Sequence, residues 1–290
     1  MASFLSSLRY LLADFIGEDD GAPPFLPDGL PDEANAIVSD AIHRLMDYQG
    51  ASYAQLYVDR LSRFVGRQDV DAAMFCEIAR LMAARMCYED PIRIAQLKLG
   101  ELDSGSAGAP STDLKKFRLD ELISSLPAPA AEPVLEALEM VGWLHKRLAI
   151  PFSTASRWGI RRLKFEAGLR RWRQFSTRFE QERVWVERWL HMIARGLAKQ
   201  PSSAPAIVAT AAMVQGYGDD YRQGLADWHA IIDGLVKPTF DGALPLSDLG
   251  GAIAEARAAA KPDPRQAALK RAIAQIRARA LAASARAAAE

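Results

Sequence analysis

The sequence predicts an all-α protein, a multi-helix bundle of roughly ten helices. Apolar residues recur at helical spacing along the 290 residues, and no segment shows a convincing strand alternation. Half of the residues are hydrophobic and a quarter are charged, as in a globular chain with a sizeable core. Clusters of proline and glycine divide the chain into segments of helix length. Together these observations favour helices throughout.

Residues 1–31 form the first predicted region, an amphipathic helix followed by an acidic linker. The apolar side chains of the helix recur at helical spacing: Phe4, Leu5, Leu8, Leu11, Leu12 and Phe15. This start lacks the charged region and cleavage site of a signal peptide. Residues 21–31 are rich in proline, glycine and aspartate, which ends the helix.

Residues 32–245 form the second predicted region, the helical domain. One helix begins near Pro31 and carries one apolar stripe: Ile37, Ala41, Leu45 and Tyr48. Gly50 interrupts it, and the next helix runs through Leu61. Residues 69–99 predict one or two helices, with Pro91 at the break or at the first helical position.

The rest of the domain begins with a flexible linker near residues 101–112. A helix is then expected over roughly residues 130–148, followed by a helical stretch over 153–200. Prolines at 201–205 and 238–245 separate the helices that follow. Residues 246–290 form the third region, a basic tail that ends in an Ala/Arg-rich helix over 264–289. Its narrow apolar seam consists of Leu269, Ile273, Ile276 and Ala280.

The cysteine content indicates a cytoplasmic protein, whereas the net charge is uninformative. Acidic and basic residues balance at 36 each, so net charge indicates no class of partner. Cys76 and Cys87 are too far apart along one helix for a disulfide, which favours two reduced thiols. No apolar run is long enough to span a membrane.

A search for catalytic or cofactor motifs predicts no catalytic, cofactor-binding or metal-binding residue. The four histidines are widely spaced and no Cys-x-x-Cys occurs, so no metal site is expected. No phosphate-binding glycine loop and no nucleophile elbow is present. A thiamine diphosphate site needs an asparagine downstream of a Gly-Asp pair, whereas the single asparagine, Asn35, lies upstream of Gly218-Asp219.

Residues 157–178 combine eight bases with one acid, Glu166, and interleave them with Trp and Phe. Such a stretch suits a protein interface or a solvated helix face. It also suits stacking on nucleic acid or binding of an anionic small ligand. The acids that follow at 180 and 182, and the neutral chain, favour the protein interface.

Ordered motifs across residues 35–235 resemble the helical C-terminal region of the indolepyruvate ferredoxin oxidoreductase family, in its long beta-type and fused subunits. The motifs are residues 48–57 with 59–61, residues 86–98, residues 169–173 with 178–182, and residues 215–219 with 222 and 224–226. The family oxidises arylpyruvates to aryl-acetyl-CoA with thiamine diphosphate, coenzyme A and iron–sulfur clusters, in aromatic amino acid catabolism.

The resemblance implies a non-catalytic structural or interaction subunit, or a fragment, of such a complex. Thiamine diphosphate, CoA and iron–sulfur clusters are then expected in partner subunits, and the chain is expected to have no activity alone. The candidate partner or ligand contacts are Tyr48, Gln49, Tyr53, Tyr57, Tyr88, Glu89, Asp90, Arg93, Arg170, Arg171, Trp172, Arg173, Gly216, Tyr217, Gly218, Asp219 and Arg222. Two alternatives stay open: an adaptor for nucleic acid or another anionic partner that uses residues 157–178, and a helical module that binds an aryl ligand or CoA.

The matched residues also have simpler interpretations. Tyr48, Tyr53 and Tyr57 recur so that one helix face presents phenols, either as core packing or as a polar lining. Glu89 and Arg93 stand four apart and predict a local ion pair. Residues 216–220 predict a tight turn followed by a helix with an acidic first turn, or a place where a partner approaches the glycine backbone.

Overall fold

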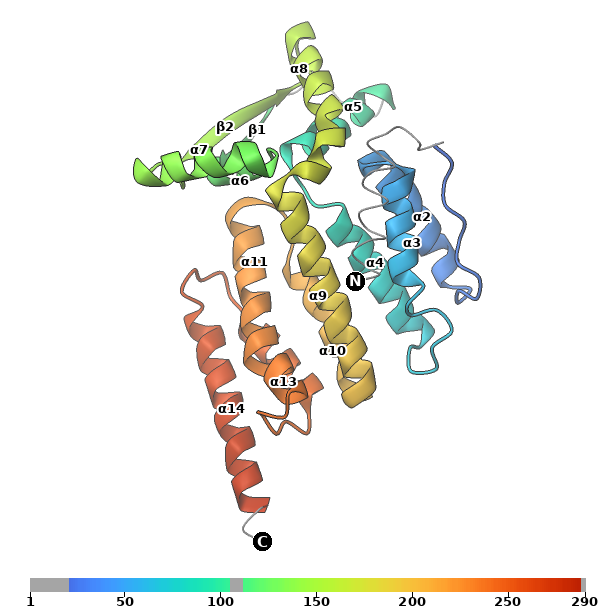
Figure 1. The fold of residues 1–290 in the computed structure, drawn as a ribbon, viewed down its shortest axis with the longest axis vertical. Helices are drawn as coiled ribbons and strands as arrows, with labels where there is room; N and C mark the ends of the chain where they lie inside the picture. The colour runs from blue at the N-terminus through green and yellow to red at the C-terminus, as the bar shows by residue number, and fades with distance from the viewer. Residues whose placement is uncertain (1–20, 105–111, 288–290) are drawn as a thin grey trace. The chain divides into compact units, whose positions relative to one another are not determined.

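The computed structural model describes residues 21–104 and 112–287 of the chain. Helices dominate these residues, which confirms the predicted all-α class (Figure 1). The amphipathic helix predicted near the start lies in residues 1–20, outside the described residues. None of the helices in the described ranges combines the length and apolar character needed to cross a membrane.

The first described helices lie close to their predicted positions, except that α5 extends beyond its predicted end. They are α2 (Ala34–Tyr48), α3 (Ala51–Leu61), α4 (Ala72–Met86) and α5 (Pro91–Asp103). Gly50, at φ 152°, separates α2 from α3 in a conformation that favours glycine. Pro91 opens α5, and the Asp90 carboxylate caps it by accepting the backbone N–H of Arg93 at 2.6 Å. The first residues of the linker predicted near 101–112 are helical, because α5 continues through Asp103, and residues 105–111 lie outside the described residues.

The sequence shows no convincing strand pattern, yet two short strands pair in the described residues. β1 (Thr112–Arg118) and β2 (Arg147–Ser153) are antiparallel, with Thr112 opposite Ser153 and Arg118 opposite Arg147. Only Phe117 and Phe152 are buried in this ribbon, so its sequence shows little alternation of apolar and polar residues. Pro151 is tolerated because each strand of a two-stranded ribbon has an open edge.

Residues 112–175 are called the arm here. The ribbon is joined by α6 (Leu119–Ser124) and α7 (Ala128–Met140), which pack on each other, and is followed by α8 (Arg157–Gly168) and the 3-10 helix η1 (Leu169–Phe175). Figure 1 shows α8 beside α5, on which it packs. The helix expected over 130–148 ends early, because Gly142 at φ +68° turns the chain into β2.

The remaining elements follow the arm. They are α9 (Thr177–Lys199), η2 (Pro201–Ser203), α10 (Ala204–Ala209), η3 (Thr210–Met213), α11 (Gly218–Ile231), η4 (Ile232–Val236), α12 (Lys237–Phe240), α13 (Leu249–Ala259) and α14 (Ala267–Ala287). Leu269, Ile273, Ile276 and Ala280 are the buried residues of α14, which confirms the predicted seam.

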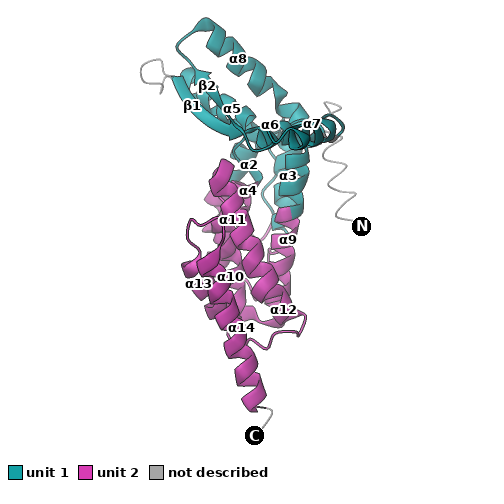
Figure 2. Ribbon diagram, turned by 90° about the vertical axis from the view of Figure 1, so that its left-hand side faces the viewer, with its two compact units in different colours: residues 1–27, 38–62, 86–184 teal, residues 28–37, 63–85, 185–290 magenta. Residues whose placement is uncertain are grey.

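The described residues divide into two compact units (Figure 2). The first unit draws its described residues from 1–27, 38–62 and 86–184, and therefore contains the whole arm. The second comprises residues 28–37 and 63–85 together with the described part of 185–290. Its core contains three buried tryptophans, Trp185, Trp189 and Trp228, with the Trp185 and Trp228 rings 5.0 Å apart. The domain boundaries predicted at residues 31 and 245 stay predictions.

Candidate functional site

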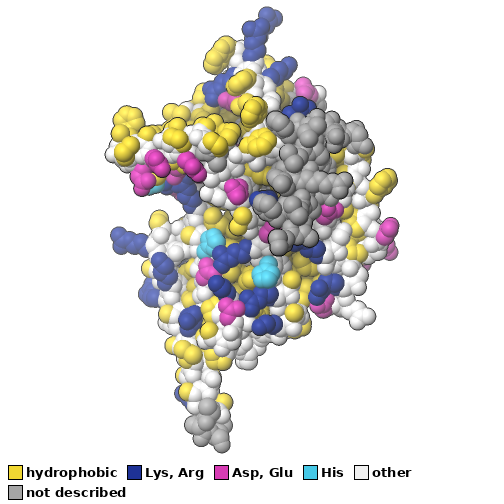
Figure 3. Space-filling model, viewed as in Figure 1, with side chains coloured by type: hydrophobic (Ala, Val, Ile, Leu, Met, Phe, Trp, Pro, Cys, Tyr) yellow, Lys and Arg dark blue, Asp and Glu magenta, His cyan; other side chains and the backbone are white. Residues whose placement is uncertain are grey.

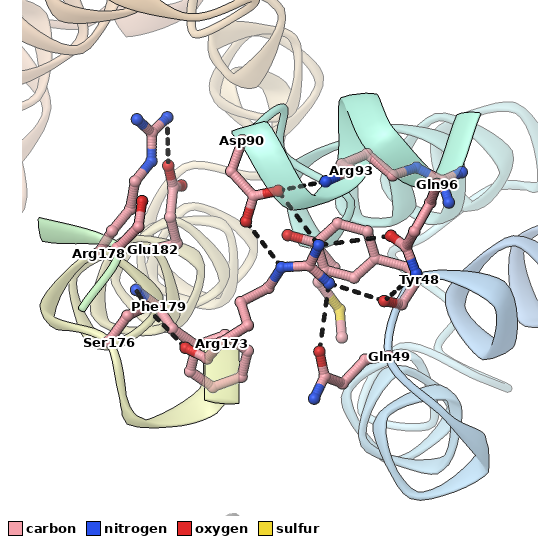
Figure 4. Close-up of polar contacts among 12 residues, drawn as sticks. Tyr48, Gln49, Asp90, Arg93, Gln96, Arg173, Ser176, Arg178, Phe179 and Glu182 are labelled. Atoms are coloured by element: carbon pink, nitrogen blue, oxygen red, sulfur yellow. Dashed lines mark hydrogen bonds and ion pairs between the residues drawn. The ribbon is translucent and has the colours of Figure 1, made fainter. Parts of the chain in front are cut away.

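Several predicted site residues meet around the guanidinium of Arg173 in the first unit (Figure 4). Arg173 lies in η1 and is 1% exposed. Its Nε donates to Asp90 Oδ2 at 2.7 Å, and its Nη2 donates to Asp90 Oδ1 at 3.1 Å. Asp90 is itself 3% exposed and caps α5. One buried carboxylate therefore orients both a helix start and the arginine.

The remaining donors of Arg173 are also occupied. Nη1 donates to the carbonyl oxygen of Tyr48 at 2.7 Å and to Gln49 Oε1 at 3.3 Å. Nη2 has a second acceptor, Gln96 Oε1, at 3.4 Å. A guanidinium has five N–H groups, and all five find acceptors here. These residues, Arg173 with Asp90, Tyr48, Gln49 and Gln96, are called the Arg173 cluster, and its arginine has no donor left for a ligand.

An aromatic ring, that of Tyr48, lies against the same guanidinium. The Arg173 guanidinium carbon lies 3.9 Å from the centre of the Tyr48 ring, and the Tyr88 ring lies 5.8 Å from the Tyr48 ring. Burial opposes the charge on Arg173, but the adjacent Asp90 carboxylate outweighs burial and raises the pKa of Arg173 above its usual range. Burial also raises the pKa of the Tyr48 phenol well above its usual value. The cluster is therefore a closed ion pair stacked on the ring of Tyr48.

The three tyrosines predicted to share one helix face do not do so. Tyr48 ends α2, whereas Tyr53 and Tyr57 lie on α3 beyond the break at Gly50. All three are buried, and the Tyr53 hydroxyl donates to the carbonyl oxygen of Met86 at 2.9 Å. This arrangement is core packing, one of the two interpretations that the sequence left open.

The predicted ion pair between Glu89 and Arg93 is absent from the described residues. Glu89 precedes Asp90, the N-cap of α5, so it lies outside the helix and the four-residue helical spacing does not apply. Glu89 is exposed, whereas Arg93 is half-buried and its guanidinium carbon lies 5.7 Å from the centre of the Tyr48 ring. The nearby thiol of Cys87 is buried, which raises its pKa to about 11.

Residues 34–234 match a family of unknown function, DUF6537. The chain belongs to this family. The matched span contains every site residue predicted from the sequence, from Tyr48 to Arg222. No curated protein and no solved structure matches the chain.

The arm of this DUF6537 member exposes an unusual amount of apolar side chain. Figure 3 shows hydrophobic side chains gathered over α7 and its neighbours. The exposed large apolar residues of the arm are Leu114, Leu126, Val134, Met140, Val141, Trp143, Leu148, Trp158, Phe165, Trp172 and Phe175. Met140 is 83% exposed and Trp158 is 72% exposed, so these side chains make few contacts within the described residues. Of the predicted contacts in this region, Arg171 and Trp172 are exposed and Arg170 is half-buried.

The eight bases of residues 157–178 divide into two groups. Arg162, Arg173 and Arg178 form ion pairs with Glu166, Asp90 and Glu182. The other five have no acidic partner among the described residues: Arg157, Arg161, Lys164, Arg170 and Arg171. The arm therefore presents uncommitted positive charge beside exposed aromatic rings.

The predicted glycine motif lies in the second unit as a turn followed by a helix. Gly216 and Gly218 have φ of +71° and +70°, and Tyr217 is the N-cap of α11. Asp219 and Asp220 lie in the first turn of α11, where acidic side chains interact favourably with the positive end of the helix dipole. Arg222 is half-buried on α11. These residues belong to a different unit from the Arg173 cluster.

A surface cleft of about 590 Å³ lies in the second unit, and residues of α11 line one part of it. It is lined by Ala212, Met213, Asp220, Gln223, Gly224, Asp227, Ala254, Arg257, Ala258, Ala260, Lys261 and Pro262. No local sequence motif indicates this cleft, because its charged residues come from two separate segments, α11 and the end of α13. No group of three or more potential metal ligands occurs within residues 21–104 and 112–287.

Proposed function

We propose that the chain is a helical interaction subunit of a thiamine diphosphate-dependent indolepyruvate or arylpyruvate oxidoreductase complex that forms aryl-acetyl-CoA. In this proposal the chain is non-catalytic, and partner subunits carry thiamine diphosphate, CoA and the iron–sulfur clusters. The complex is proposed to be cytoplasmic, where thiols such as Cys76 and Cys87 stay reduced. The ordered motifs in residues 35–235 support the choice of partner.

The exposed apolar surface of the arm is the observation that supports an interaction role most strongly. Single exposed hydrophobic residues are common, but large groups of them mark interaction sites. Trp, Phe and Met are enriched in protein interfaces, and Trp158, Phe165 and Met140 are each more than two-thirds exposed. A partner that covers these side chains would remove their apolar area from water.

The Arg173 cluster supports a structural role for three of the motifs, those at residues 48–57, 86–98 and 169–173. Its buried hydrogen bonds connect the end of α2 and the start of α5 with η1. Because η1 ends the arm, this cluster holds the base of the interaction surface on the helices of the first unit. The motifs are therefore explained as support for a docking surface.

The experiment is affinity capture of the full chain from a native extract, with partners identified by mass spectrometry. We expect thiamine-dependent oxidoreductase subunits to be recovered by the wild type. The double variant Trp158→Ser with Phe165→Ser should recover at least about tenfold less. The matched control is Leu281→Ser, which removes a 51% exposed apolar residue from α14 and should leave recovery unchanged.

Two outcomes would contradict this proposal. One is the absence of thiamine-dependent oxidoreductase subunits from the captured material. The other is equal recovery by the wild type and the double variant, because all three substituted side chains are exposed and none supports the core.

A second candidate function is binding to nucleic acid or another polyanion. It is favoured by the five uncommitted bases, which lie beside Trp158, Phe165 and Trp172. Exposed aliphatic residues of the arm, such as Met140 and Leu148, argue for a protein partner because bases offer them no stacking. A titration with single-stranded DNA or RNA at low salt decides: binding that weakens steeply with salt supports this candidate. The absence of binding removes it.

A further inference from the structure

We propose that the cleft in the second unit binds a small zwitterion, an α-amino acid with a large apolar side chain. This inference goes beyond the proposed interaction subunit and does not depend on the arm. It rests on a cavity of about 590 Å³, within the size range of small-molecule sites, whose charged groups are not paired with one another.

Asp227 on α11 provides the acceptor for the ammonium group. It is 5% exposed and lines the cleft. Its Oδ1 accepts N–H groups from Gln223 at 2.8 Å and from Gln266 at 2.7 Å. Within the described residues, Oδ2 accepts no hydrogen bond and no cation pairs with the carboxylate. A largely buried carboxylate with an unused oxygen matches an ammonium or another N–H donor.

Gln266 holds this carboxylate in a fixed orientation. It has φ +53°, the one positive φ of a non-glycine residue in the described part of the chain. A side chain in this region of backbone conformation is strained, and such strain is retained where the surrounding structure requires it. The strained backbone places the Gln266 amide on Oδ1, so that Oδ2 keeps its direction in the absence of a ligand.

Arg257 and Lys261 provide the opposite charge. Both line the cleft at the end of α13, and neither has an acidic or hydrogen-bond partner for its side chain among the described residues. The negative end of the α13 dipole favours these cations but leaves their N–H groups free. A carboxylate is the ligand group that such donors bind.

The combination of charges selects the zwitterion. An anion alone would be repelled by Asp227 and by the exposed Asp220, and a cation alone would be repelled by Arg257 and Lys261. Ala212, Ala254, Ala258 and Met213 also line the cleft, so an apolar side chain has a matching surface. A methionine sulfur makes favourable contacts with aromatic rings, which makes L-phenylalanine a suitable probe.

Isothermal titration calorimetry on the full chain tests the proposal with three probes of one shape. L-phenylalanine carries both charges, 3-phenylpropanoate lacks the ammonium group, and phenethylamine lacks the carboxylate. We expect L-phenylalanine to bind at least about tenfold tighter than either truncated probe. No binding of L-phenylalanine up to about 10 mM would overturn the proposal, as would equal affinity for 3-phenylpropanoate.

Variants then assign the two ends of the ligand. Asp227→Asn should reduce L-phenylalanine affinity to that of 3-phenylpropanoate. The double variant Arg257→Gln with Lys261→Gln should reduce it to that of phenethylamine. The matched control, Arg286→Gln, removes an exposed arginine of α14 outside the cleft and should change nothing.

Folding does not confuse this test. Circular dichroism shows whether Asp227→Asn is folded. If that variant unfolds, the double variant of Arg257 and Lys261 provides the test, because neither side chain forms a hydrogen bond or ion pair among the described residues. Unchanged affinity in the double variant overturns the proposal. The arm variants of the capture experiment leave the cleft intact, so the two proposals can fail separately.

Discussion

At the scale of single residues, Arg173 is the side chain whose role the structure changes most. In the sequence it stands among neighbouring bases, and it was expected to contact a partner or ligand. In the structure its five N–H groups are saturated by Asp90, Gln49, Gln96 and the Tyr48 carbonyl. Its exposed neighbour Arg171, which has no described partner, is the side chain available for contacts.

Replacing Arg173 should therefore destabilise the first unit strongly. Arg173→Met leaves Asp90 buried and unpaired, and we expect the free energy of unfolding to fall by about 3–5 kcal/mol. Arg173→Lys should also destabilise, because an ammonium cannot reproduce the two parallel hydrogen bonds to Asp90. Urea unfolding measures both changes.

The matched control for this series is Arg171→Gln, which should change stability by no more than about 0.5 kcal/mol. Combining Arg173→Met with Asp90→Asn should cost less than the sum of the single variants, because the two residues form one ion pair. A loss below about 1 kcal/mol for Arg173→Met would show that the pair does not hold the unit together.

At the scale of elements, Gly224 determines how closely η3 and α11 approach in the second unit. A Cβ atom added at Gly224 would lie 2.0 Å from the carbonyl oxygen of Met213, a backbone atom that cannot move aside alone. Gly224 also lines the cleft. The glycine that the resemblance singled out is therefore explained by close packing of backbone on backbone.

Gly224→Ala should consequently reduce the free energy of unfolding by about 1–3 kcal/mol, through overpacking. Gly168→Ala is the matched control, because nothing lies within 4 Å of a Cβ added there at the end of α8. That control should be neutral or stabilising by up to about 1 kcal/mol, since alanine restricts the unfolded chain. Chemical denaturation of both variants makes the comparison, and equal stability of the two would contradict the packing argument.

At the scale of the whole molecule, the six tryptophans divide evenly between an exposed and a buried group. The arm of the first unit exposes Trp143, Trp158 and Trp172 by 51%, 72% and 55%. The second unit buries its tryptophans to 5% exposure or less. A unit that exposes several aromatic rings is expected in a chain that works by association.

Fluorescence quenching measures this division. Iodide should quench the arm tryptophans more strongly than caesium does, because uncommitted bases such as Arg157 and Arg161 attract an anion. Trp158→Phe should lower the fraction of emission that iodide quenches, whereas Trp189→Phe, the control in the core, should raise it. Equal quenching by the two ions would contradict the predicted positive electrostatic potential around the exposed tryptophans of the arm.

Local patterns in the sequence were sufficient for the helical class and for several boundaries. The sequence predicts the separation of α2 from α3 at Gly50 and the seam of α14, and a helix start at Pro91 is one of the two placements it leaves open. Each depends on backbone chemistry or on helical periodicity within a few residues. The two-stranded ribbon was missed because only one residue of each strand is buried.

The tertiary structure alone decided which predicted residues are available for contacts. Arg173 finds Asp90 83 residues away and Tyr48 125 residues away along the chain, and no local pattern specifies partners at such separations. The cleft likewise combines charges from α11 and from the end of α13. The sequence alone determined a helical chain with polar and aromatic motifs. Only the tertiary structure decided which of these motifs are buried in the core and which face solvent, because burial depends on packing between distant segments.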